Sequence, residues 1–71
     1  MTTTGTEWIA AFSERLGVDA PDAATIEVLL ELAGVAAHAS ERIAAPIACW
    51  LVGRAGIDPL HALDTARTVA P

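Results

Sequence analysis

Residues 29–56 read LLELAGVAAHASERIAAPIACWLVGRAG, and this stretch decides the fold because it joins two strongly apolar helices through a short break. The break covers residues 40–45. Pro46 suits the first turn of the helix that follows, where the N–H that proline lacks has no partner in any case. This helix should end between Gly53 and Gly56, because glycine is favoured just beyond a helix C-terminus. Its large apolar residues are Ile47, Trp50, Leu51 and Val52.

The helix before the break is predicted to begin at Asp22 or Thr25 and to run to about Ala39. Its apolar residues form one face of Ile26, Leu29, Leu30, Ala33, Ala36 and Ala37 and a second face of Val28, Leu32 and Val35. A helix that is apolar around most of its circumference is typically buried or sandwiched. Gly34 costs about 1 kcal/mol relative to alanine in a helix interior, which favours a close approach of another helix there.

One further helix is predicted on each side of this pair. The first should begin near Thr4, which has capping-box spacing to Glu7, and should end at Gly17. Its apolar stripe consists of Trp8, Ile9, Phe12 and Leu16. The last should begin at Asp58 and Pro59, an acidic N-cap followed by proline. Its apolar pattern continues through Leu60, Leu63, Ala66 and Val69. The sequence therefore predicts an all-α fold, a small bundle of four short helices.

The length of 71 residues predicts a single helical domain over residues 1–71, with residues 1–5 flexible. A domain of this size buries only about 60% of the surface of its unfolded chain. Yet 54% of the residues are hydrophobic, and the mean hydropathy is +0.47. Large apolar side chains should therefore stay exposed in a monomer, and such patches mark interaction sites. This composition favours a lasting partner, either another protein or a second copy.

The charge balance is acidic, with nine carboxylates, four arginines, no lysine and a net charge of −5. Nucleic acids and anionic lipid surfaces both attract positively charged proteins, so we expect neither as a partner. The start MTTTGTE lacks the basic and apolar segments of a signal peptide. The longest apolar run, residues 43–53, is shorter than the roughly 20 residues of a membrane-spanning helix. We therefore expect a cytoplasmic protein.

No complete catalytic, cofactor or metal-binding motif is present, so we expect no enzyme activity and no cofactor. His38 has the chemistry of a ligand, base or pH sensor, but a histidine near a helix C-terminus more often interacts with the helix dipole. Cys49 is predicted to be a buried, unreactive thiol because its neighbours are apolar. Glu27 and Glu31 lie one helical turn apart and are interpreted as a solvated acidic stripe.

Arg42 and Arg54 bracket the most apolar segment of the chain. A guanidinium at such a place can hold a phosphate or a partner carboxylate, or it can simply pair with a nearby glutamate. Trp50 is either a core residue or an interface anchor, since tryptophan is enriched among binding hot spots. The residues predicted to bind a partner are Arg42, Pro46, Trp50, Ile47, Arg54 and His38.

A helix with Trp8 is followed by LLELAGVAAH at residues 29–38 and by RIAAPIACWLVGRAG at residues 42–56. This order, which covers about two thirds of the chain, resembles a small actinobacterial domain family of unknown function that occurs alone or fused to molybdenum-cofactor guanylyltransferases. The matching residues are Leu29, Leu30, Glu31, Leu32, Ala33, Ala37, His38, Arg42, Ala44, Ala45, Pro46, Leu51, Val52 and Gly53. Ile43 and Gly34 depart from the pattern, in which a proline and a polar residue stand at these positions. The resemblance implies a cytoplasmic link to molybdenum-cofactor biology and assigns no catalytic residue.

These observations lead to one functional hypothesis and two alternatives. The first is a non-catalytic accessory protein or small subunit that docks on a molybdenum-cofactor enzyme, such as formate dehydrogenase, or on its cofactor-maturation machinery. The second is a small helical protein in which His38 and Arg42 bind the phosphate of a molybdopterin nucleotide. The third is a homodimeric interaction module.

Overall fold

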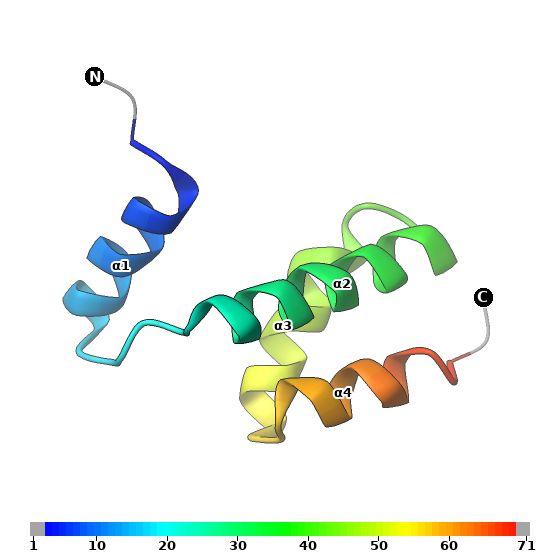
Figure 1. Ribbon diagram of the computed structural model, residues 1–71. Helices are drawn as coiled ribbons and strands as arrows, with labels where there is room; N and C mark the ends of the chain where they lie inside the picture. Colours follow the sequence, from blue (N-terminus) through cyan, green and yellow to red (C-terminus); the bar gives the residue numbers. More distant parts are fainter. Residues whose placement is uncertain (1–2, 70–71) are drawn as a thin grey trace.

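The computed structural model describes residues 3–69, which form four α-helices and no strand (Figure 1). In chain order the helices are α1 (Gly5–Leu16), α2 (Ala23–Ala39), α3 (Ala44–Ala55) and α4 (Pro59–Ala66). The all-α fold class is therefore confirmed. Of the N-terminal segment that was predicted to be flexible, Met1 and Thr2 lie outside the described residues, whereas Thr4 and Gly5 form the beginning of α1.

Three helices begin at side-chain caps that the sequence predicts. The Thr4 hydroxyl accepts a hydrogen bond from the Glu7 N–H at 3.1 Å, and the Glu7 carboxylate accepts one from the Thr4 N–H at 3.2 Å. Hydrogen bonding with the Thr4 side chain, and then with its backbone, lowers the pKa of the Glu7 carboxyl. Asp22 accepts from the Thr25 N–H at 2.8 Å, and its pKa is lowered by hydrogen bonding with the Thr25 side chain and backbone. Asp58 caps α4 in the same way.

The other helix boundaries agree only in part with those predicted from the sequence. Two C-terminal ends are confirmed. Gly17 and Gly56 close α1 and α3 with φ angles of 75° and 68°, the left-handed conformation in which glycine replaces other residues without strain. However, α3 begins at Ala44, so the predicted break is too long, and Pro46 occupies the third helical position. Helix α4 ends at Ala66, and Val69 lies beyond it in a turn rather than in the helix.

The core lies where α3 and α4 both pack against α2. Leu32 of α2 is only 2% exposed, and it forms the buried core together with Ala62 and Leu63 of α4. The partly buried residues around them are Val28, Val35, Ala48, Cys49, Val52 and Ala66. Helix α2 is thus the central helix, as its broad apolar surface predicts. The side that carries Leu30 nevertheless faces solvent, with Leu30 67% exposed.

Helix α1 projects away from the other three helices instead of completing a four-helix bundle (Figure 1). Its connection to α2, residues 17–22, contains Pro21, which favours an extended conformation for the residue before it. The rings of Trp8 and Phe12 stack against each other with centroids 4.9 Å apart, yet Trp8 remains 57% exposed. Within residues 3–69, Trp8, Phe12 and Leu16 of the apolar stripe of α1 therefore remain exposed, and only Ile9 is partly buried.

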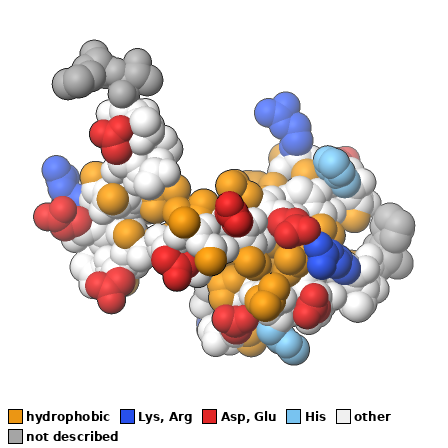
Figure 2. Space-filling model, viewed as in Figure 1, with side chains coloured by type: hydrophobic (Ala, Val, Ile, Leu, Met, Phe, Trp, Pro, Cys, Tyr) orange, Lys and Arg blue, Asp and Glu red, His pale blue; other side chains and the backbone are white. Residues whose placement is uncertain are grey.

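The overall dimensions reflect this open arrangement. The radius of gyration is 12.9 Å, whereas a compact chain of this length has a radius of gyration of about 11 Å. The accessible surface is 5,633 Å², whereas a compact monomer of this mass exposes about 4,200 Å². In the space-filling view, apolar side chains extend from α1 across the connection and over the surface of the remaining helices (Figure 2). The chain thus exposes more total surface than a compact monomer of its mass, and exposed large apolar side chains form part of that surface.

The expectation of a close helix approach at Gly34 was wrong. A Cβ atom built on Gly34 meets no neighbouring atom within 4 Å, because that side of α2 faces open space.

Gly34→Ala should therefore raise the free energy of unfolding by about 1 kcal/mol through the better helix propensity of alanine. Urea denaturation followed by circular dichroism measures this. Gly17→Ala, at a φ of 75°, should instead destabilise the protein. A loss of stability in Gly34→Ala would contradict the observed packing.

Candidate docking surface

One side of α3 presents a row of exposed residues to solvent. Pro46, Trp50 and Arg54 are spaced four residues apart, so they follow one another along a single side of the helix. The opposite side packs on the core through Ala48 and Val52. Trp50 is 62% exposed, which is unusual for so large an apolar side chain. We call the exposed side formed by Pro46, Trp50 and Arg54 the outer face of α3.

A second row of apolar residues runs beside the outer face. Ile43, Ile47 and Leu51 are again four residues apart, and all three are exposed. Ile43 is the N-cap residue of α3 and is 72% exposed, more than any other large hydrophobic residue among residues 3–69. The two rows together give α3 a continuous apolar surface. Such a surface is typical of protein–protein contact regions.

Two arginines stand at the ends of this surface. Arg42 lies in the tight turn before α3, where its carbonyl accepts a hydrogen bond from the Ala45 N–H at 3.1 Å. Arg54 lies in the last turn of α3, where a cation also interacts favourably with the helix dipole. Neither guanidinium forms an ion pair within residues 3–69. Five of the six predicted partner-binding residues therefore lie on α3 or in the turn that precedes it.

His38 is the exception, because it lies on a different surface. It is exposed in the last turn of α2 and lines a shallow hollow together with Glu31 and Arg67. Arg67, at the end of α4, forms an ion pair with Glu31. Arg42 does not line this hollow. The hollow beside His38 therefore contains one carboxylate and one guanidinium that already pair with each other.

The remaining reactive groups are not assembled into a chemical site. Cys49 is partly buried against the core, in agreement with its apolar sequence neighbours. Among residues 3–69, no cluster of three or more His, Cys, Asp or Glu side chains has an arrangement that could hold a metal ion. None of the helices in this part of the chain is long and apolar enough to span a membrane.

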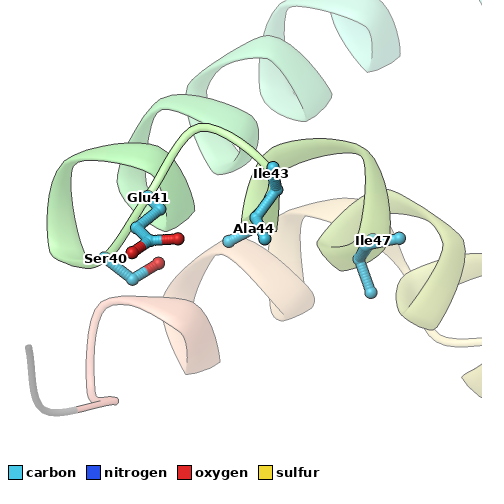
Figure 3. A pocket seen from close by; sticks show the side chains of 5 residues that line it. All are labelled: Ser40, Glu41, Ile43, Ala44 and Ile47. Atoms are coloured by element: carbon cyan, nitrogen blue, oxygen red, sulfur yellow. The ribbon is translucent and has the colours of Figure 1, made fainter.

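An apolar groove lies over the C-terminal part of α2, between α3 and the end of α4. Both α3 and α4 pack on α2 but make little contact with each other, and the open groove between them has a volume of about 410 Å³. Its lining includes the small residues Ala36, Ala39, Ala44, Ala48 and Ala66 and the larger residues Val35, Ile47, Leu51 and Val69. At the end of α2 the groove continues past Ser40 and Glu41, which lie across the turn from Ile43, Ala44 and Ile47 (Figure 3).

The comparison with protein families finds one match. A family model described as a domain of unknown function (DUF6457) matches residues 2–71. The chain belongs to the DUF6457 family. This membership confirms that the chain is a member of a domain family of unknown function, which is the coarser part of what the sequence resemblance implied. Neither the curated proteins nor the solved structures compared with this DUF6457 chain give a match.

Two features of this DUF6457 domain were missed in the sequence. Ile43 and Leu51 belong to the exposed surface of α3, and their four-residue spacing from Ile47 was the signal that could have identified them. The groove between α3 and α4 had no such signal. It depends on the angle at which α3 and α4, which follow one another in the chain, pack on α2. The periodicity of apolar residues does not determine this angle.

Proposed function

We propose that this chain is a non-catalytic docking protein of the cytoplasm. It acts as an accessory protein or small subunit that binds a molybdenum-cofactor enzyme of the formate dehydrogenase kind, or the machinery that matures its cofactor. The outer face of α3 makes the contact. The resemblance of residues 29–53 to domains fused with molybdenum-cofactor guanylyltransferases supports this choice of partner.

The exposure of Trp50 is the observation that carries the proposal. A tryptophan that is 62% exposed contributes little to the fold of the free chain. Tryptophan and arginine are, however, the residues most enriched among those that dominate binding energies. Here Trp50 lies between Pro46 and Arg54 on one helix side, with exposed isoleucines beside it.

The charges on the outer face indicate what the partner surface contains. The chain as a whole is acidic, with a net charge of −5. Arg42 and Arg54 nevertheless flank Trp50, and the outer face itself contains no carboxylate. Complementary potentials favour specific and rapid association. The partner should therefore present an apolar pocket for Trp50 with acidic side chains on both sides of it.

Binding measurements with purified partners test this proposal. The full chain is immobilised, and the molybdenum-cofactor enzyme and the guanylyltransferase from the same host are passed over it in biolayer interferometry. We expect saturable binding to one of them. Absence of binding to both would contradict the proposal. Calorimetry with a molybdopterin nucleotide should give no heat, whereas a saturable heat would favour the phosphate-binding alternative.

A further inference from the structure

We infer that the groove between α3 and α4 holds helix α1 of a second copy, so that two chains exchange their α1 helices and form a closed dimer. This inference goes beyond the proposed function, because it concerns α1 and the groove. The groove shares Ile47 and Leu51 with the second apolar row of α3, but it does not include Pro46, Trp50 or Arg54 of the outer face. Among residues 3–69, the apolar side of α1 and the groove are both uncovered.

Helix α1 is amphipathic, like a helix of a bundle, but its apolar side is not packed against other helices. Trp8, Phe12 and Leu16 follow one another at four-residue spacing on one side and are all exposed. The carboxylates Glu7 and Glu14 lie on the other side. An amphipathic helix of 12 residues is marginal in water unless its apolar side packs on something. The apolar side of α1 therefore requires a partner surface.

Helix α1 fits the groove in length and in the size of its side chains. Three helices already surround the core, and a fourth laid between α3 and α4 would complete a four-helix bundle. Helix α1 has 12 residues, and the groove follows α3 from Ala44 to Leu51, so most of the length of α1 would lie against α3. The groove is lined largely by alanine, and α1 carries aromatic rings. Bulky side chains opposite small ones are what close helix packing requires.

The charges at the two surfaces are also complementary. Arg15 is the only basic residue of α1, and it lies beside Trp8 and Phe12. Glu41 is the charged residue at the open end of the groove, next to Ile43 and Ala44 (Figure 3). Neither Arg15 nor Glu41 forms an ion pair within residues 3–69. An α1 helix seated in the groove of another chain would bring these opposite charges to the same rim.

The exposed area agrees with a dimer of ordinary size. The chain exposes 5,633 Å², which exceeds the area expected for a compact monomer by about 1,400 Å². A standard interface needs only about 800 Å² from each partner. In a symmetric dimer, α1 of each chain occupies the groove of the other chain, so every contact is made twice.

The connection between α1 and α2 explains why the groove of the same chain stays open. The Val18 N–H donates to the Ser13 carbonyl at 3.0 Å, and this bond with Gly17 fixes the direction in which the chain leaves α1. Residues 17–22 then lead to the N-terminal end of α2. The groove lies along the opposite end, from Val35 to Ser40. The connection therefore holds α1 beyond its own groove, within reach of a neighbouring molecule.

Sedimentation equilibrium of the full chain is the first test. We expect a mass of twice the 7.3 kDa chain. Phe12→Asp places a charge on the apolar side of α1 and should raise the dimer dissociation constant at least about 100-fold. Leu60→Asp is the matched control, because Leu60 is exposed on α4 and does not line the groove. It should leave the mass unchanged. A monomeric wild-type chain would overturn the inference.

The second test distinguishes helix exchange from a dimer in which two α1 helices pair with each other. Leu51→Asp alters a groove wall and leaves α1 intact. Helix exchange predicts a monomer for this variant, and predicts that mixing it with Phe12→Asp restores dimers, since each mixed pair keeps one intact contact. Pairing of α1 with α1 predicts a normal Leu51→Asp dimer, which would overturn the inference. Circular dichroism establishes that both variants are folded.

A charge exchange tests the orientation of α1 in the groove. Arg15→Glu and Glu41→Arg should each raise the dimer dissociation constant about fivefold, as expected for ion pairs at an exposed rim. The double variant Arg15→Glu/Glu41→Arg should return it to the wild-type value. Additive weakening in the double variant would show that the two side chains do not meet, and would overturn the proposed placement of α1.

Discussion

Replacement of Leu32 by alanine is expected to lower the free energy of unfolding by about 2–5 kcal/mol, more than any other single leucine-to-alanine substitution on α2. Leu32 is 2% exposed and contacts both α3 and α4 across the core. Removal of a buried leucine side chain costs about 2–5 kcal/mol. Native domains are stable by only about 0.05–0.15 kcal/mol per residue, or about 4–11 kcal/mol for a chain of this length, so the substitution removes a large share of the total stability. The fully buried core contains only two other residues among those described, Ala62 and Leu63, and neither can compensate.

The neighbouring position on the same helix provides the control. Leu30 is 67% exposed, so Leu30→Ala removes the same atoms without creating a cavity. Urea titration followed by far-ultraviolet circular dichroism compares the two variants with the wild type. Leu30→Ala should retain a folding transition close to that of the wild type. Equal losses in both variants would contradict the location of the core.

Replacement of Trp50 by alanine is expected to weaken binding to the molybdenum-cofactor partner by at least about 30-fold, the effect of a hot-spot residue. The cause is the loss of the large apolar anchor at the centre of the outer face of α3. The fold should not change, because Trp50 makes little contact with the core. Biolayer interferometry with the partner identified above measures the change in dissociation constant.

The matched control for this variant is Leu60→Ala. Leu60 is about as exposed as Trp50 but lies on α4, away from the outer face of α3. Its replacement should alter the dissociation constant by less than about twofold, as expected for a residue outside the contact. If the two variants bind the partner equally well, the contact does not involve Trp50.

The helices could be predicted from the sequence because their signals are local. The capping pairs Thr4–Glu7 and Asp22–Thr25 act within four residues of each other, and the structure contains both. The glycines that end α1 and α3 are also a local signal, because each ends its helix by adopting a positive φ angle. The end of α4 was less predictable, because apolar spacing alone extends the pattern to Val69 while the helix stops at Ala66.

The arrangement of the helices could not be predicted in the same way. The apolar stripe of α1 is correctly identified as a helix face, but periodicity does not say which surface covers it. The grouping of His38 and Arg42 at one phosphate site stays a prediction. His38 lines a hollow together with Glu31 and Arg67, and Arg42 is not among the residues that line it. Glu31 and Arg67 are 36 positions apart in the chain, so their ion pair has no local sequence signal.

The most direct measurement of the central claim observes Trp50 itself during docking. The variant Trp8→Phe leaves Trp50 as the only tryptophan, since the chain has two. Labelling this chain with 5-fluorotryptophan gives one fluorine resonance, which is followed as the unlabelled molybdenum-cofactor partner is added. We expect the resonance to shift and to lose its sensitivity to solvent deuterium as Trp50 enters the partner pocket. A resonance that stays solvent-sensitive at saturating partner would contradict docking through the outer face of α3.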